Sequence, residues 1–146
     1  MKTELIKQKN SWSCLACCAC MATNTPLNQL YDFLGHDGSD VVQQSDHPEG
    51  RKSFSLIEII KYMLNCGVIS SFLSCNKKIA MKDVISSCIP AIIIIASNVH
   101  VKNGTHAIYW DGTNLMCPRK GLLSSRTRLK RVVIVLPLIN IKEIGK

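Results

Sequence analysis

The change in hydrophobic period along the chain is the feature that most limits how it can fold. Through residues 12–66, apolar side chains recur at the spacing of amphipathic helices, whereas residues 90–137 carry short apolar runs such as the β-branched segment 91–97. Helices followed by strands indicate an α+β fold with helices packed on an antiparallel sheet. A length of 146 residues fits one domain, 1–146, with a helical part at about 12–88 and a sheet part at about 90–137.

Three helices are predicted from residues that commonly begin or end helices. The predicted starts are at Ser13, Pro26 and Ser55, and the predicted ends are at Ala22, Gly35 and Gly67. Ser55 and Glu58 have the spacing of a capping box, which strengthens the third start. A further short helix is predicted at 81–88, and the polar, turn-rich segment 36–53 is predicted to be an exposed loop.

Four strands are predicted in the second half, at 91–97, 105–110, 113–118 and 131–138. The Asp111-Gly112 pair between the second and third strands is typical of a hairpin turn. Pro137 lacks a backbone N–H group, so the last strand is expected at an edge of the sheet or to end near this residue.

The net charge of +8 favours weak electrostatic binding of acidic proteins, nucleic acid or an anionic membrane surface, although a solvated basic surface is the plainer interpretation. Basic residues gather at 51–52, 77–78, 119–120 and 126–131. Aromatic residues make up only 5% and do not alternate with the basic ones, so a stacking platform for single strands is not expected. The apolar run at 89–96 is too short to span a bilayer, and no signal peptide is recognised, so a cytoplasmic location with reduced thiols is expected.

Four of the eight cysteines, Cys14, Cys17, Cys18 and Cys20, fall within seven positions. The spacing of Cys14 and Cys17 suits zinc or a redox pair, but the remaining cysteines are solitary and no strand precedes the cluster. We therefore expect no metal and no cofactor, and we interpret Cys17, Cys18 and Cys20 as small core residues. Cys14 differs because it lies at the predicted first turn, where a helix N-terminus stabilises a thiolate nucleophile.

A cysteine nucleophile needs a base, and the four histidines are the candidates. His36 and His47 lie in the polar loop, and His100 lies in a predicted turn. His106 opens a predicted apolar strand, where a histidine often has only a structural role. The residue types and their spacing leave the choice open.

Gln8, then Cys14 six positions later at a helix start, then His106 at the start of a distant strand, resemble the papain-like cysteine peptidases. The pattern is similar to that of compact bacterial and phage types related to the bacteriocin leader-processing (double-glycine) peptidases, and it covers residues 7–34 and 89–118. The resemblance implies a thiol hydrolase acting on a peptide or protein, with Cys14 as nucleophile, His106 as base and Gln8 as an oxyanion donor. Trp12 is expected to line the substrate cleft or simply to pack.

The residue that should orient the imidazole departs from the family pattern. Relatives carry Asp or Asn before a proline, whereas Cys117 precedes Pro118 here, and a neutral thiol is a poor acceptor. Asp111 and Asn114 are the alternatives for this role. The sequence thus predicts a cysteine peptidase whose third catalytic residue is in question. The alternative is a catalytically impaired papain-like domain that binds protein or nucleic acid through its basic surface, and acyl transfer by the same residues also stays open.

Overall fold

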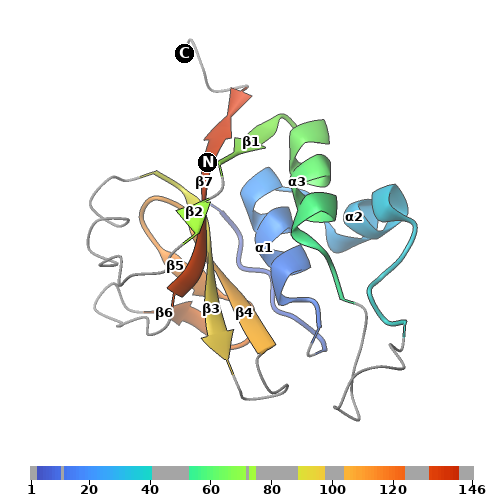
Figure 1. Cartoon of the computed structure of the whole chain (residues 1–146), viewed down its shortest axis with the longest axis horizontal. Helices are drawn as coiled ribbons and strands as arrows, with labels where there is room; N and C mark the ends of the chain where they lie inside the picture. The colour runs from blue at the N-terminus through green and yellow to red at the C-terminus, as the bar shows by residue number, and fades with distance from the viewer. Residues whose placement is uncertain are drawn as a thin grey trace.

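The computed structural model describes residues 3–10, 12–40, 53–71, 73–74, 89–97, 104–123 and 132–141. Within these residues, the helices are α1 (Cys14–Thr23), α2 (Leu27–Leu34) and α3 (Leu56–Asn65). The strands are β1 (Val68–Ser70), β2 (Leu73–Ser74), β3 (Ala91–Ser97), β4 (Gly104–Trp110), β5 (Leu115–Cys117), β6 (Gly121–Leu123) and β7 (Val132–Asn140). Figure 1 shows the three helices together beside the sheet, which is the α+β arrangement that the sequence predicted.

All strand pairings in the described sheet are antiparallel, in the order β1-β7-β3-β4-β5-β6, with β2 also paired to β7. The long strands β3 and β4 pair over their whole length, from Ala91 opposite Trp110 to Ser97 opposite Gly104. By contrast, β5 pairs with β4 at Tyr109 and Trp110, the last two residues of β4. The helix α1 packs against β4, so its first residue is brought close to this strand.

The sheet separates two apolar clusters because successive strand residues face opposite sides. The larger cluster lies between the helices and the sheet and includes Ile92, Ala107 and Tyr109. The smaller one lies on the other face and includes Ile108 and Trp110.

The middle of α1 is built from small side chains that are fully buried, and this lets the helix pack closely on the sheet. Cys17, Cys18 and Cys20 are free thiols with no exposed surface, which confirms their interpretation as core residues. Burial raises the pKa of Cys17 to about 11 and that of Cys20 to about 12. These thiols are therefore neutral and poorly suited to attack a substrate.

The helix ends follow the predicted signals with one exception. Ser55 accepts a hydrogen bond from the Glu58 N–H, and the Glu58 carboxylate accepts one from the Ser55 N–H, so the capping box is confirmed. Gly35 ends α2 in the left-handed region, with φ of 75°. Ser13 does precede α1, but its side chain makes no capping hydrogen bond, so its predicted role as a side-chain cap is wrong.

Three parts of the sheet differ from the sequence prediction. The short strands β1 and β2 lie in the part expected to be helical, and β6 was not expected. In addition, β7 lies inside the sheet, so the edge position inferred from Pro137 is wrong. The Pro137 carbonyl accepts from the Ser71 N–H, between the β1 and β2 pairings. The proline nitrogen points to this interrupted side of β7 and not to β3. The helix predicted at 81–88 lies outside the described residues.

In the described ranges, the structure has no helix long and apolar enough to cross a bilayer.

Candidate functional site

Cys14 is the first residue of α1 and is partly buried where this helix meets β4. The backbone N–H of Ala107 lies close enough to the Cys14 sulfur to favour the thiolate form, and Ala107 directly follows His106 in β4. Cys14 and Ala107, which are far apart in the sequence, are thus brought to neighbouring positions by the packing of α1 on β4.

The Cys14 thiol is held in its neutral form. Burial raises its pKa above the ordinary value of 9.0 and outweighs the opposing effects of the backbone N–H groups of Ala107 and Leu15 and of the Arg119 charge. The expectation that the helix N-terminus would favour a thiolate here is therefore wrong in its net direction. A nucleophilic role for Cys14 requires a base that removes the proton during attack.

His106 is buried, with 5% of its surface exposed, and both ring nitrogens have partners. Its Nε2 atom lies 3.1 Å from the Cys117 sulfur, and its Nδ1 atom lies 3.4 Å from Nη2 of Arg119. A guanidinium only donates hydrogen bonds, so Nδ1 is the acceptor and the ring proton is on Nε2, from which it is donated to Cys117. The nitrogen that would act as base, Nδ1, is therefore directed at Arg119.

Cys117 ends β5 and is buried on the sheet face of the smaller apolar cluster. In addition to the His106 contact, its sulfur accepts a hydrogen bond of 3.3 Å from the Lys120 backbone N–H. The turn at 118–120 thus holds the Cys117 thiol against the imidazole. The position at which the resemblance implied Asp or Asn is therefore in contact with His106, but it supplies sulfur and not oxygen.

Gln8 reaches the same region from the N-terminal segment. Its backbone N–H donates to the Pro118 carbonyl at 2.9 Å, which fixes the segment beside the turn that follows Cys117. Its side-chain Nε2 donates to the Asn10 carbonyl at 2.7 Å, while Oε1 is buried without a hydrogen-bond partner. One amide hydrogen is thus used by the Asn10 carbonyl, and the oxyanion role of Gln8 stays a prediction.

The structure does not bring Asp111 to His106. The Asp111 carboxylate accepts from the backbone N–H groups of Thr113 and Asn114, at 2.7 and 2.5 Å, and so stabilises the turn between β4 and β5. Asp111 directly follows β4 and lies five residue steps beyond His106, about 17 Å along the extended chain. Asp111 and Asn114 therefore serve the turn, and neither alternative for the orienting residue fits.

Trp12 links the start of α1 to the segments around it. Its indole Nε1 donates to the Asp37 carbonyl at 3.2 Å, and its own carbonyl accepts from the Ser53 hydroxyl at 2.6 Å. Its ring also packs against the larger apolar cluster. These contacts support the packing role that the sequence left open beside a cleft-lining one.

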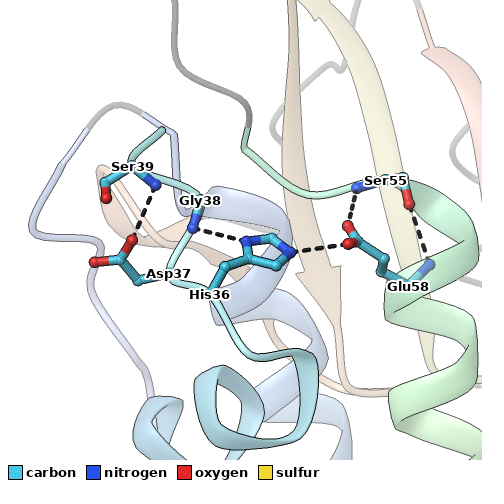
Figure 2. A network of polar contacts seen from close by, with 6 residues as sticks. All are labelled: His36, Asp37, Gly38, Ser39, Ser55 and Glu58. Atoms are coloured by element: carbon cyan, nitrogen blue, oxygen red, sulfur yellow. Dashed lines mark hydrogen bonds and ion pairs between the residues drawn. The ribbon is translucent and has the colours of Figure 1, made fainter. Parts of the chain in front are cut away.

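His36, another candidate base, belongs to a separate network between α2 and α3 (Figure 2). Its Nδ1 atom accepts from the Gly38 N–H at 3.0 Å, and its Nε2 atom lies 2.8 Å from the Glu58 carboxylate. Both ring nitrogens are therefore used in holding the segment after α2 against the start of α3. His47 and His100 lie outside the described residues, so His106 is the described histidine that lies next to the Cys14 region.

Arg119 is the residue of this site that the sequence analysis did not single out. In the sequence it belongs to the basic pair at 119–120, and its position two residues after Cys117 is the available signal. Its guanidinium contacts His106 and is close enough to Cys14 to lower that thiol's pKa. Among the described residues, no cluster of three or more potential ligands could hold a metal ion.

No known protein-family model and no curated protein matches the sequence. Among solved structures, the fold is similar to the crystal structure of a double glycine motif protease from an AMS/PCAT transporter in complex with the leader peptide. The superposition has a TM-score of 0.55 at 15% sequence identity and covers 94% of this chain and 91% of that one. At this identity the likeness is one of fold, and it confirms the predicted papain-like α+β architecture.

Proposed function

We propose that the protein is a cysteine peptidase that cleaves a peptide or amide bond with Cys14 as nucleophile and His106 as base. The observation that carries this proposal is the contact between the Cys14 sulfur and the backbone of Ala107, next to His106, in a fold similar to that of a peptidase.

In the proposed resting state, the Cys14 thiol and the His106 imidazole are both neutral, and this determines the order of the proton transfers. Nδ1 of His106 takes the proton from the Cys14 thiol as the sulfur attacks the carbonyl carbon, and the second Gln8 amide hydrogen and the Cys14 N–H stabilise the oxyanion. His106 then gives the proton to the leaving amine, which leaves a thioester on Cys14. Water attacks the thioester carbonyl while His106 accepts its proton. The bond to sulfur then breaks, the carboxylic acid is released, and His106 returns the proton to the Cys14 thiolate, which restores the resting enzyme.

The proposed substrate is a peptide or a protein segment. The enzyme is proposed to act in the cytoplasm and to need no cofactor. The double glycine motif protease with a similar fold was crystallised with a leader peptide, which supports a peptide ligand. The basic surface adds weak attraction for acidic segments.

The test is hydrolysis of a mixed peptide library, followed by mass spectrometry. We expect cleavage by the wild-type protein, loss of cleavage in Cys14→Ala and His106→Gln, and retention in Cys66→Ser, which alters a partly buried thiol at the end of α3. An acyl adduct on Cys14, trapped at low pH, would identify the nucleophile. Full activity in Cys14→Ala would exclude the proposal.

The second candidate is a papain-like domain with impaired catalysis that serves as a binding module. It is favoured by the sulfur of Cys117 at Nε2 of His106 and by the burial that raises the Cys14 pKa. For this function, the wild-type protein would leave the whole library intact, and Cys14→Ala would bind its partner as tightly as the wild type.

A further inference from the structure

Arg119 is half-buried, and the described part of the chain supplies no counter-charge for it. None of the described carboxylates lies within ion-pair distance of its guanidinium. Its hydrogen bond to the His106 ring is long, at 3.4 Å, and its buried Nε atom has no hydrogen-bond partner. A guanidinium carries five N–H donors, so the described residues use little of its hydrogen-bonding capacity.

The groups around Arg119 do not compensate its charge. The Cys14 thiol is neutral, the His106 ring carries no negative charge, and the next residue in the chain is a lysine. Removing a cation from water without an anion or several acceptors nearby is unfavourable. The uncompensated charge of Arg119 is therefore best explained by an anionic ligand group that pairs with the guanidinium in the functional complex.

The place of Arg119 ties such a group to the proposed active site. Arg119 lies in the turn between β5 and β6, directly after Pro118, whose carbonyl accepts from the Gln8 backbone N–H. Its guanidinium contacts the nitrogen of His106 that would act as base, and its charge acts on Cys14. An anion bound by Arg119 therefore lies beside the bond that would be cleaved.

We infer that Arg119 forms a carboxylate subsite of the active site and selects substrates that present a carboxylate next to the scissile bond. This inference rests on the proposed peptidase function. The carboxylate comes from an Asp or Glu side chain or from the free C-terminus of the substrate, and it pairs with the planar guanidinium through two parallel hydrogen bonds. When this pair forms, the guanidinium leaves Nδ1 of His106, and Nδ1 becomes the acceptor for the Cys14 proton.

Binding to Cys14→Ala protein tests the subsite without requiring turnover. The probes are fluorescent decapeptide pools in which one position carries Glu or, in the matched pool, Gln, each made with a free or an amidated C-terminus. We expect the best Glu pool to bind about tenfold more tightly than its Gln partner, as a charge-assisted hydrogen bond predicts. If the C-terminus is the source, the free-acid pools gain this factor over the amidated pools.

The variants are introduced into the Cys14→Ala protein. Arg119→Gln should abolish the carboxylate preference. Arg119→Lys should keep part of it, because the positive charge is retained, and this result would show that the loss in Arg119→Gln does not come from misfolding. Lys120→Gln is the matched control, because it removes an adjacent exposed charge, and it should keep the full preference. Equal binding of all pools by the parent protein, a preference that survives Arg119→Gln, or one that Lys120→Gln also abolishes would each overturn the inference.

The cleavage assay separates this result from the proposed function. If peptides bind through Arg119 in a carboxylate-dependent way but the wild-type protein cleaves none of them, the subsite is supported and the peptidase function is refuted. If the wild-type protein cleaves peptides without any carboxylate preference, the peptidase function is supported and the subsite is refuted.

Discussion

The Nε2 atom of His106 lies 3.1 Å from the sulfur of Cys117. Sulfur is a weak hydrogen-bond acceptor, and the neutral thiol brings no negative charge to stabilise the imidazolium that forms during proton transfer. The contact therefore fixes the direction of the ring but supports its base function only weakly. The rate of any reaction at Cys14 should depend on which atom occupies this position.

Cys117→Asp should raise the rate of peptide cleavage because a carboxylate oxygen would accept from Nε2 and stabilise the charged ring. Removing the orienting residue of a Ser-His-Asp site costs about 10⁴ in turnover. A cysteine nucleophile depends less on its base, so we expect a gain of roughly ten- to a hundredfold. Steady-state kinetics on one cleaved peptide measure this gain in kcat.

Two further variants control this prediction. Cys117→Asn offers an oxygen acceptor without burying a charge, and it should show a smaller gain. Asp111→Ala should leave kcat unchanged, because this carboxylate is used in the turn by Thr113 and Asn114. Loss of activity in Asp111→Ala with no gain in Cys117→Asp would show that the orienting residue has been misassigned.

Alkylation of Cys14 by iodoacetamide should rise with a midpoint above pH 9.0, because burial raises the thiol's pKa above that ordinary value. Arg119→Gln should move the midpoint still higher, since the Arg119 charge favours the thiolate and its loss favours the thiol. Peptide mapping by mass spectrometry across pH 6–11 measures both midpoints. Rapid labelling of Cys14 near pH 6 would contradict this prediction and restore the thiolate expected from the helix terminus.

The fold was largely predictable from the sequence because its signals are local. The β-branched run of β3, the Asp111-Gly112 turn and the capping box of Ser55 and Glu58 each depend on residues close together in the chain. The short strands β1 and β2 carry no such signal, since they form by pairing with the distant strand β7. Pro137 misled the prediction because the ladder leaves a gap at its nitrogen, which no local pattern reveals.

The candidate site was predictable only as far as its residues resemble a known pattern. Gln8, Cys14 and His106 could be picked out by order and spacing, and Cys117 could be recognised as a departure. The raised pKa of Cys14 could not be foreseen, because burial depends on how α1 packs against β4. The contact of Arg119 with His106 also depends on the turn between β5 and β6 and not on sequence distance.

Purified protein should contain no stoichiometric zinc, and a chelator should leave its melting temperature unchanged. The physical reason is that Cys17, Cys18 and Cys20 are buried in the apolar core as neutral thiols, whereas zinc requires thiolates arranged around it. Elemental analysis and thermal melts with and without EDTA measure this. About one zinc per chain would show that the cysteine cluster is a ligand set.

The carboxylate of Glu58 joins two structural elements, because it accepts from the Ser55 N–H at the start of α3 and contacts His36 after α2. Burial opposes its ionisation, but the hydrogen bonds from Ser55 and His36 together outweigh burial and lower the pKa of Glu58 below its ordinary value of 4.5. A carboxyl group whose pKa is lower in the folded state stabilises the fold above its unfolded pKa. This contribution is lost as the pH falls through the lower, folded value.

Glu58→Gln should therefore reduce the free energy of unfolding at pH 7 by about 1 kcal/mol, the usual magnitude for a helix cap, and by progressively less as the pH falls through the lowered pKa and the wild-type carboxyl group becomes protonated. Urea unfolding of both proteins at several pH values between 3 and 7 measures the difference. Ser55→Ala is the control, since it removes the hydroxyl that caps the Glu58 N–H but keeps the carboxylate contact with His36, so its cost should vary little with pH. A Glu58→Gln cost that stays constant down to pH 3 would show that the carboxylate charge does not stabilise this junction.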